Sequence, residues 1–133
     1  MILIVFLTTI MSFKCFAQET ESFESFFFTY STDEDFQIER TKFPLEFVTW
    51  DNPTEIGGEV VTKYITKETW EHNYFYMDQT YRPQIFDNHE GKLRDTDERL
   101  FQWIGIETGV NSKYFFKRID GLWYLIKMEN LGD

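Results

Sequence analysis

Aromatic side chains first recur at helical spacing between residues 21 and 30. The four that stand at positions i, i+3, i+4 and i+7 are Phe23, Phe26, Phe27 and Tyr30. This spacing places them on one face of an amphipathic helix. Ser31 and Glu34 then form a capping box, which predicts a second short helix over residues 33–39 that buries Phe36. The three acids at its start are interpreted as first-turn acids, favoured there by the helix dipole, rather than as a metal site.

The pattern then changes to short extended runs separated by turn residues. Four strands are expected before the last hairpin, at residues 45–50, 59–65, 82–86 and 98–107. The first two are expected to pair with each other. Thr66 can cap a short helix that runs through Trp70 and Tyr74. The fourth strand is apolar on both faces, with Phe101 and Trp103 on one of them.

The last third of the chain is typical of a long β-hairpin. Aromatic and β-branched runs at 113–119 and 122–128 flank the dipeptide Asp120-Gly121. A two-residue type I′ turn needs positive φ at both central positions, and Asp-Gly satisfies this need well. Because helices come first and a mostly antiparallel sheet follows, the sequence predicts an α+β fold.

The turn also predicts which residues of the hairpin are directly opposed, and opposed residues share a face of the sheet. Phe115 is expected opposite Ile126, on a face that also carries Met128. Arg118 is expected opposite Trp123, on the other face. Neither face is polar enough to be a free solvated surface. One face is therefore predicted to pack on the N-terminal helices, and the other to line a cavity or meet a partner chain.

Residues 1–17 are interpreted as a cleaved signal peptide. Their apolar run is too short to cross a bilayer as a helix, which takes about 20 residues. Small residues at Cys15 and Ala17 predict cleavage before Gln18. No Lys or Arg precedes the apolar run, which leaves open an upstream start codon or a buried N-terminal element. Lipid anchoring through Cys15 is a further alternative, disfavoured because Lys14 precedes the cysteine.

Cleavage would leave residues 18–133, enough for a single α+β domain. It would also remove the only cysteine, so no disulfide, thiol nucleophile or thiolate ligand is expected. The formal charge of −10 opposes binding to nucleic acid and to anionic membrane surfaces. The sequence thus predicts an acidic, exported protein, periplasmic or extracellular, without stable membrane insertion after cleavage.

Two stretches of the chain resemble a known superfamily. They are residues 35–45, together with the later Trp70, and residues 116–125 of the last hairpin. The order of helices and strands, with residues 116–125, resembles the nuclear-transport-factor-2-like superfamily, which includes SnoaL-like cyclases and ketosteroid isomerases. More narrowly, residues 35–45 with Trp70 resemble a bacterial family of exported proteins of unknown function. The resemblance implies a cystatin-like cone, in which N-terminal helices pack on a strongly curved, mostly antiparallel sheet with a pocket at the wide end. It also implies ligand binding, dimerisation through the sheet or acid–base catalysis, and fold analogy alone does not choose among them.

Few motifs in the chain carry reactive chemistry. The histidines, His72 and His89, are too far apart in sequence for a His-x-x-x-His metal pair, so no metal or cofactor is expected. Asp87, His89 and Glu90 are interpreted as a solvated loop rather than as a cation site. There is no nucleophile elbow and no phosphate-binding glycine loop. Acid–base catalysis by a cavity Asp or Glu with a Tyr stays open.

The candidate ligand-binding residues are Trp50, Trp103, Arg118 and Trp123. Arg118 either binds an acidic group of a ligand or, as we prefer, stacks on Trp123 in a cation–π contact. Trp50 and Trp103 either line a pocket or fill the core. We therefore expect a non-catalytic domain that binds a small apolar or aromatic ligand or a protein, with a homodimer through the sheet as one form. The alternatives are a cofactor-free isomerase or cyclase and an acidic inhibitor or immunity-type protein with a basic target.

Overall fold

The structure is a computed structural model that describes residues 20–51, 58–75, 81–92, 94–106 and 109–132. Its elements, in chain order, are α1 (Phe23–Thr32), α2 (Glu34–Glu39), β1 (Thr41–Trp50), β2 (Val60–Ile65), the 3-10 helix η1 (Lys67–Thr69), β3 (Tyr81–Phe86), β4 (Glu98–Gly105), β5 (Asn111–Ile119) and β6 (Leu122–Asn130). The predicted signal peptide lies outside the described residues. None of the helices in the described part is long and apolar enough to span a bilayer.

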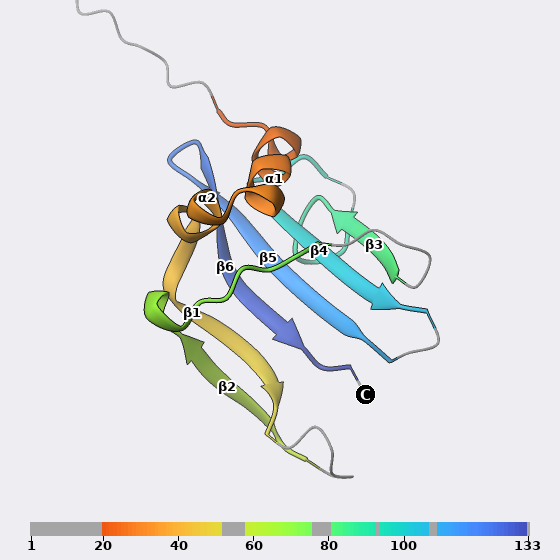
Figure 1. The fold of residues 1–133 in the computed structure, drawn as a ribbon. Helices are drawn as coiled ribbons and strands as arrows, with labels where there is room; N and C mark the ends of the chain where they lie inside the picture. Colours follow the sequence, from red (N-terminus) through yellow and green to blue (C-terminus); the bar gives the residue numbers. More distant parts are fainter. Residues whose placement is uncertain (1–19, 52–57, 76–80, 93, 107–108, 133) are drawn as a thin grey trace, which may run out of the picture.

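The six strands form one curved sheet in the order β2-β1-β6-β5-β4-β3. β1 and β6 are parallel, and the other neighbours are antiparallel. Figure 1 shows α1 and α2 on one side of this sheet. The α+β class and the helices packed on a curved, mostly antiparallel sheet are confirmed.

Helix α1 follows the predicted periodicity. Its four predicted apolar residues, Phe23, Phe26, Phe27 and Tyr30, are all buried. The hydroxyl of Ser22 caps the helix by accepting the backbone N–H of Ser25 at 3.3 Å. Phe28 lies between the buried positions and is 72 % exposed, so the helix has one apolar face and one solvated face.

The start of α2 corrects the predicted capping box. Asp33, and not Ser31, is the N-cap: its carboxylate accepts the backbone N–H of Phe36 at 2.9 Å. Ser31 still belongs to α1, and its hydroxyl donates to the carbonyl of Phe28. The fully buried side chain of α2 is Gln37, whereas Phe36 is half-buried against the core.

One strand start and one helix differ clearly from the prediction. β1 begins at Thr41, four residues early, because Thr41 pairs with Leu125 on the parallel strand β6. The helix predicted to run through Trp70 and Tyr74 is wrong, since only η1 forms there, Trp70 has extended backbone angles and residues 71–75 belong to no helix or strand. β2, β3 and β4 match their predicted strands within two residues, and residue 107 lies outside the described residues.

The β5–β6 hairpin forms around the predicted turn. Asp120 and Gly121 both have positive φ, 51° and 81°. Arg118 lies opposite Trp123, as predicted. The predicted pairing of Phe115 with Ile126 is wrong, because a register shift inserts Ile126 as a bulge and Phe115 pairs with Lys127. Met128 therefore moves to the opposite face.

The core lies between α1 and the inner face of the sheet and is largely aromatic. Its buried members are Phe23, Phe26, Phe27, Tyr30, Leu45, Phe101, Tyr114, Phe116, Trp123 and Leu125. Residues 70–75, which we call the crossing segment, pass across this inner face in Figure 1 and bring Phe75 against Phe27, Phe101 and Tyr114. The inner space is thus filled by packed rings.

The outer face of the hairpin is only partly shielded. Phe115, Ile119, Leu122 and Ile126 are half-buried. The ring of His89 stands edge-on to Phe115 at 5.1 Å, so the loop after β3 covers part of this face. That the rest of the face lines a cavity or meets a partner chain stays a prediction.

Candidate functional site

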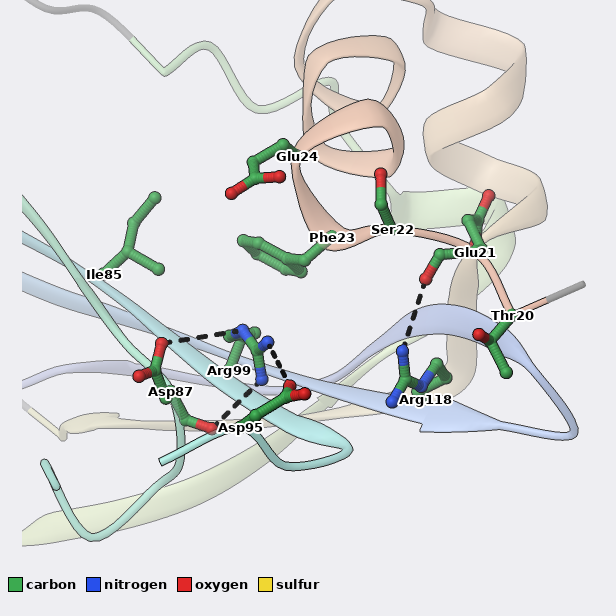
Figure 2. Close-up of a pocket in the computed structure, with 10 residues that line it drawn as sticks. All are labelled: Thr20, Glu21, Ser22, Phe23, Glu24, Ile85, Asp87, Asp95, Arg99 and Arg118. Carbon is green, nitrogen blue, oxygen red and sulfur yellow. Dashed lines mark hydrogen bonds and ion pairs between the residues drawn. The ribbon is translucent and has the colours of Figure 1, made fainter. Parts of the chain in front are cut away.

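A surface pocket of about 500 Å³ opens where α1 begins. It lies between the N-terminal turn of that helix and the loop that joins β3 to β4, as Figure 2 shows. We call it the α1 pocket. Its lining residues are Thr20, Glu21, Ser22, Phe23, Glu24, Ile85, Asp87, Asp95, Arg99 and Arg118.

Arg99 forms one wall of the α1 pocket from the inner face of β4. Its guanidinium carbon lies 5.2 Å from the ring centre of Trp123 and 5.8 Å from that of Phe23. One terminal nitrogen, Nη1, donates to the backbone carbonyls of residues 87, 96 and 98, at 3.1, 2.6 and 2.9 Å. The other, Nη2, lies 3.3 Å from Asp95, and Nε lies 4.0 Å from the carboxylate of Asp87. The guanidinium is therefore largely saturated by the protein itself.

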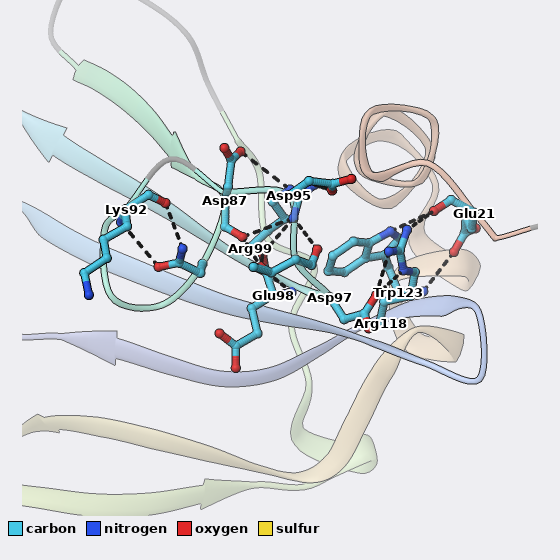
Figure 3. Close-up of polar contacts among 11 residues, drawn as sticks. Glu21, Asp87, Lys92, Asp95, Asp97, Glu98, Arg99, Arg118 and Trp123 are labelled. Carbon is cyan, nitrogen blue, oxygen red and sulfur yellow. Dashed lines mark hydrogen bonds and ion pairs between the residues drawn. The ribbon is translucent and has the colours of Figure 1, made fainter.

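Arg118 contacts the same tryptophan, and Figure 3 shows the indole ring between Arg99 and Arg118. Its guanidinium carbon is 5.1 Å from the ring of Trp123. Its Nε donates to the carboxylate of Asp97 at 2.7 Å, and Nη2 completes the pair at 2.5 Å. Trp123 is completely buried between the two arginines. This geometry matches the stacked interpretation of Arg118.

Glu21 ties the segment before α1 to the sheet. Its carboxylate accepts Arg40 at 2.7 Å and the backbone N–H of Trp123 at 2.9 Å. Its carbonyl accepts the indole N–H of the same tryptophan, and its own N–H donates to the carbonyl of Gly121. Both charged side chains are less than one-fifth exposed. These contacts hold the rim of the α1 pocket against the tip of the hairpin.

Once these ion pairs are assigned, the α1 pocket retains unbalanced negative charge. Glu21 is paired with Arg40, and Arg118 with Asp97. Of the three remaining acids, Asp87 and Asp95 share one guanidinium, that of Arg99. Glu24 forms no ion pair with another described residue.

A second polar cluster lies inside the cone, beneath the crossing segment. The hydroxyl of Tyr30 lies 2.8 Å from that of Thr41, and the hydroxyl of Tyr114 donates to the side-chain carbonyl of Asn73 at 3.4 Å. Gln37 exchanges two hydrogen bonds with the backbone of Asn73. Burial raises the pKa of Tyr114 to about 12 and also raises that of Tyr30. In the described part of the chain, neither tyrosine hydroxyl contacts a carboxylate.

A family model for a domain of unknown function, DUF4348, matches residues 9–132. The chain belongs to this family. No curated protein matches it.

Three solved structures from Bacteroides are similar to this DUF4348 domain. An NTF2-like protein from Bacteroides fragilis has a TM-score of 0.61 and 22 % identity over 86 % of this chain and 49 % of its own, so the domain spans about half of that structure. A cystatin-like protein from Bacteroides caccae has a TM-score of 0.54 and 24 % identity over 85 % and 78 %. A protein from Bacteroides uniformis has a TM-score of 0.53 and 21 % identity over 83 % and 76 %. At these identities the likeness establishes the NTF2-like, cystatin-like fold.

The structure brings two of the four predicted ligand-binding residues of the DUF4348 domain together. Arg118 lines the α1 pocket and Trp123 lies beneath it. Trp50 is half-buried at the far end of β1, opposite Val60, and Trp103 packs against the core from β4. Neither lines the α1 pocket, and their binding role stays a prediction.

Sequence reasoning missed the other walls of the α1 pocket. Arg99 carried a usable signal, because it stands two residues before Phe101 and so shares the apolar inner face of its strand. A cation on that face is expected to stack on a ring or meet an acid. Glu24 and Asp87 carried no such signal, since only tertiary packing brings a first-turn acid to the end of β3.

Proposed function

We propose that this DUF4348 domain is an exported, non-catalytic binding domain and that the α1 pocket is its binding site. One observation carries the proposal. The α1 pocket is a concave surface whose size falls within the range of small-molecule sites, about 300–1,000 Å³, and it combines the apolar walls of Phe23 and Ile85 with several charged groups. Rigid elements hold these groups, because Arg99 and Glu21 are fixed by several hydrogen bonds each.

The interior of the cone favours packing over catalysis. An isomerase or cyclase site needs a carboxylate within hydrogen-bond reach of a tyrosine hydroxyl inside an apolar cavity. The hydroxyls of Tyr30 and Tyr114 bond instead to Thr41 and Asn73, both neutral. Phe75 and its neighbouring rings occupy the space above them. The binding proposal therefore assigns no catalytic residue.

Chemical-shift mapping tests the site. A panel of small amines, carboxylic acids and neutral sugars would be titrated into the 15N-labelled protein. We expect at least one compound to shift the backbone amides of Phe23, Glu24, Asp87 and Asp95 in a saturable way and to be recovered unchanged after a day. Shifts confined to the crossing segment, chemical conversion of a bound compound, or no saturable shift across the panel would contradict the proposal.

The export part of the proposal rests on the N-terminal pattern alone. Intact-mass analysis of protein recovered from a bacterial envelope fraction is expected to give a chain that starts at Gln18. A chain that retains residues 1–17 would overturn export by a cleaved leader. A lipid-modified Cys15 would replace it with membrane anchoring.

A further inference from the structure

We infer that the α1 pocket takes an alkylammonium group, either the end of a lysine side chain or a free diamine. The inference rests on the proposed function and names the ligand class of the same site. Its chemistry is a cation carried on a short apolar stem. Three features of the pocket support it: its negative charge, the protein acceptors that already bond its two arginines, and its apolar walls.

The charge of the α1 pocket favours a cation. Asp87 and Asp95 share the guanidinium of Arg99. Glu24 has no ion-pair partner among the described residues, so a ligand with positive charge would complete the balance. Asp87 is 37 % exposed at its side chain and lies at the outer limit of an ion pair with Arg99, 4.0 Å away. Its carboxylate therefore has lone pairs left for a ligand ammonium.

The two arginines of the α1 pocket are poorly placed to hold an anion. Arg99 donates to three backbone carbonyls and to Asp95, and Arg118 is held by Asp97 through two of its nitrogens. A bound carboxylate or phosphate would have to displace these protein acceptors. It would also approach Glu24, which lies in the first turn of α1 and offsets the positive end of the helix dipole.

The apolar walls suit the stem of such a ligand. In Figure 2, Phe23 and Ile85 lie between Glu24 on α1 and Asp87 at the end of β3. Ile85 is 46 % exposed although it is a large aliphatic residue, so it offers surface that a methylene chain can cover. An ammonium group between the two carboxylates would place its carbon chain along these two side chains.

The whole chain supports the same ligand class. Its formal charge of −10 raises the local concentration of cations and steers a basic partner toward the molecule. This long-range field is screened by salt over about 8 Å at physiological ionic strength, so part of the affinity should fall as salt rises.

Four probes test the ligand class by titration into the labelled protein: 1,5-diaminopentane, Nα-acetyl-lysine methylamide, the matching norleucine derivative and hexanoate. We expect the two amines to shift the amides of Phe23, Asp87 and Asp95. We expect the norleucine derivative and hexanoate to leave them unchanged. Removing one charge-assisted contact by Asp87→Asn or Glu24→Gln should weaken amine binding about tenfold.

A matched control separates the site from the general field of the protein. Asp51 is exposed at the far end of β1, and Asp51→Asn removes the same charge away from the α1 pocket. This variant should bind the amines within about twofold of the wild type, because exposed charges more than a Debye length away are largely screened.

The outcomes are distinct. Binding of the lysine derivative alone assigns the site to a protein partner, and binding of diaminopentane alone assigns it to a small amine. Equal binding of the norleucine derivative, binding of hexanoate at the pocket amides, or equal weakening by Asp51→Asn overturns the inference while leaving the α1 pocket as a site. Failure of all four probes also overturns it, and the proposed function falls only if the wider panel fails too.

Discussion

At the scale of single residues, the buried tyrosines connect burial to a measurable pH dependence. The pKa of Tyr114 is raised to about 12 by burial, whereas an unfolded tyrosine titrates near pH 10. The native state thus keeps a proton that the unfolded state loses. The stability from this group is complete below about pH 10 and is lost as pH rises toward 12.

We therefore expect the Tyr114→Phe variant to lose less stability in alkali than the wild type. Its free energy of unfolding should fall less steeply between pH 10 and 12, by up to about 1.4 kcal/mol per pH unit. Urea unfolding at several pH values measures this slope. Tyr64→Phe is the control. Tyr64 is 66 % exposed, so its replacement should leave the slope unchanged. Parallel profiles for wild type and Tyr114→Phe would contradict the assignment.

The ion pair of Glu21 and Arg40 gives a second residue-scale prediction. Glu21→Gln should lower the free energy of unfolding by about 2–3 kcal/mol, because it leaves the largely buried guanidinium without its charged partner. Glu90→Gln should change it by less than about 0.5 kcal/mol, since the pairs of Glu90 with Lys92 and Arg94 are more than half exposed. Thermal and urea unfolding measure both changes, and equal losses would show that burial of the Glu21 pair contributes nothing.

At the scale of elements, local pattern predicted some features well and others poorly. The apolar face of α1 and the Asp120-Gly121 turn follow from neighbouring residues, so the sequence was sufficient for them. The early start of β1 depends on a parallel partner 84 positions later in the chain, Leu125 for Thr41. The bulge at Ile126 likewise reflects how β6 fits between β1 and β5. Neither feature has a local signal.

The crossing segment yields the element-scale prediction. Gln37 accepts the N–H of Asn73 at 2.7 Å and donates to its carbonyl at 3.0 Å, so this one side chain replaces a strand partner. Gln37→Leu should speed hydrogen exchange at the Asn73 amide at least about tenfold, since each lost hydrogen bond of a buried group is worth about 1–3 kcal/mol.

Two comparisons make the exchange measurement decisive. The amides of the β5–β6 pair, such as that of Phe116, should keep most of their protection in the same sample, which excludes global unfolding. Gln84→Leu, at an exposed site on β3, should not change the exchange of Asn73. Unchanged protection of Asn73 in Gln37→Leu would show that other contacts hold the crossing segment.

At the scale of the whole molecule, the sequence predicted the fold better than it predicted the site. Helix-first order and antiparallel hairpins predicted the α+β class, the family resemblance implied the cone, and the similar solved structures agree with both. The α1 pocket joins the start of α1, the end of β3 and the tip of the last hairpin. The Arg118–Trp123 pair was predicted because hairpin register sets it. Arg99 carried a signal that went unused, and Glu24 and Asp87 reach the pocket through tertiary packing alone.

The most direct test of recognition at the α1 pocket is to locate a bound amine by nuclear Overhauser effects. Diaminopentane would be bound to the 13C-labelled protein, and contacts from its methylene protons would be recorded. We predict contacts to the ring of Phe23 and the methyl groups of Ile85. Contacts to Phe75 or Trp103 instead, or no intermolecular contacts when the amine is bound at saturation, would contradict the account.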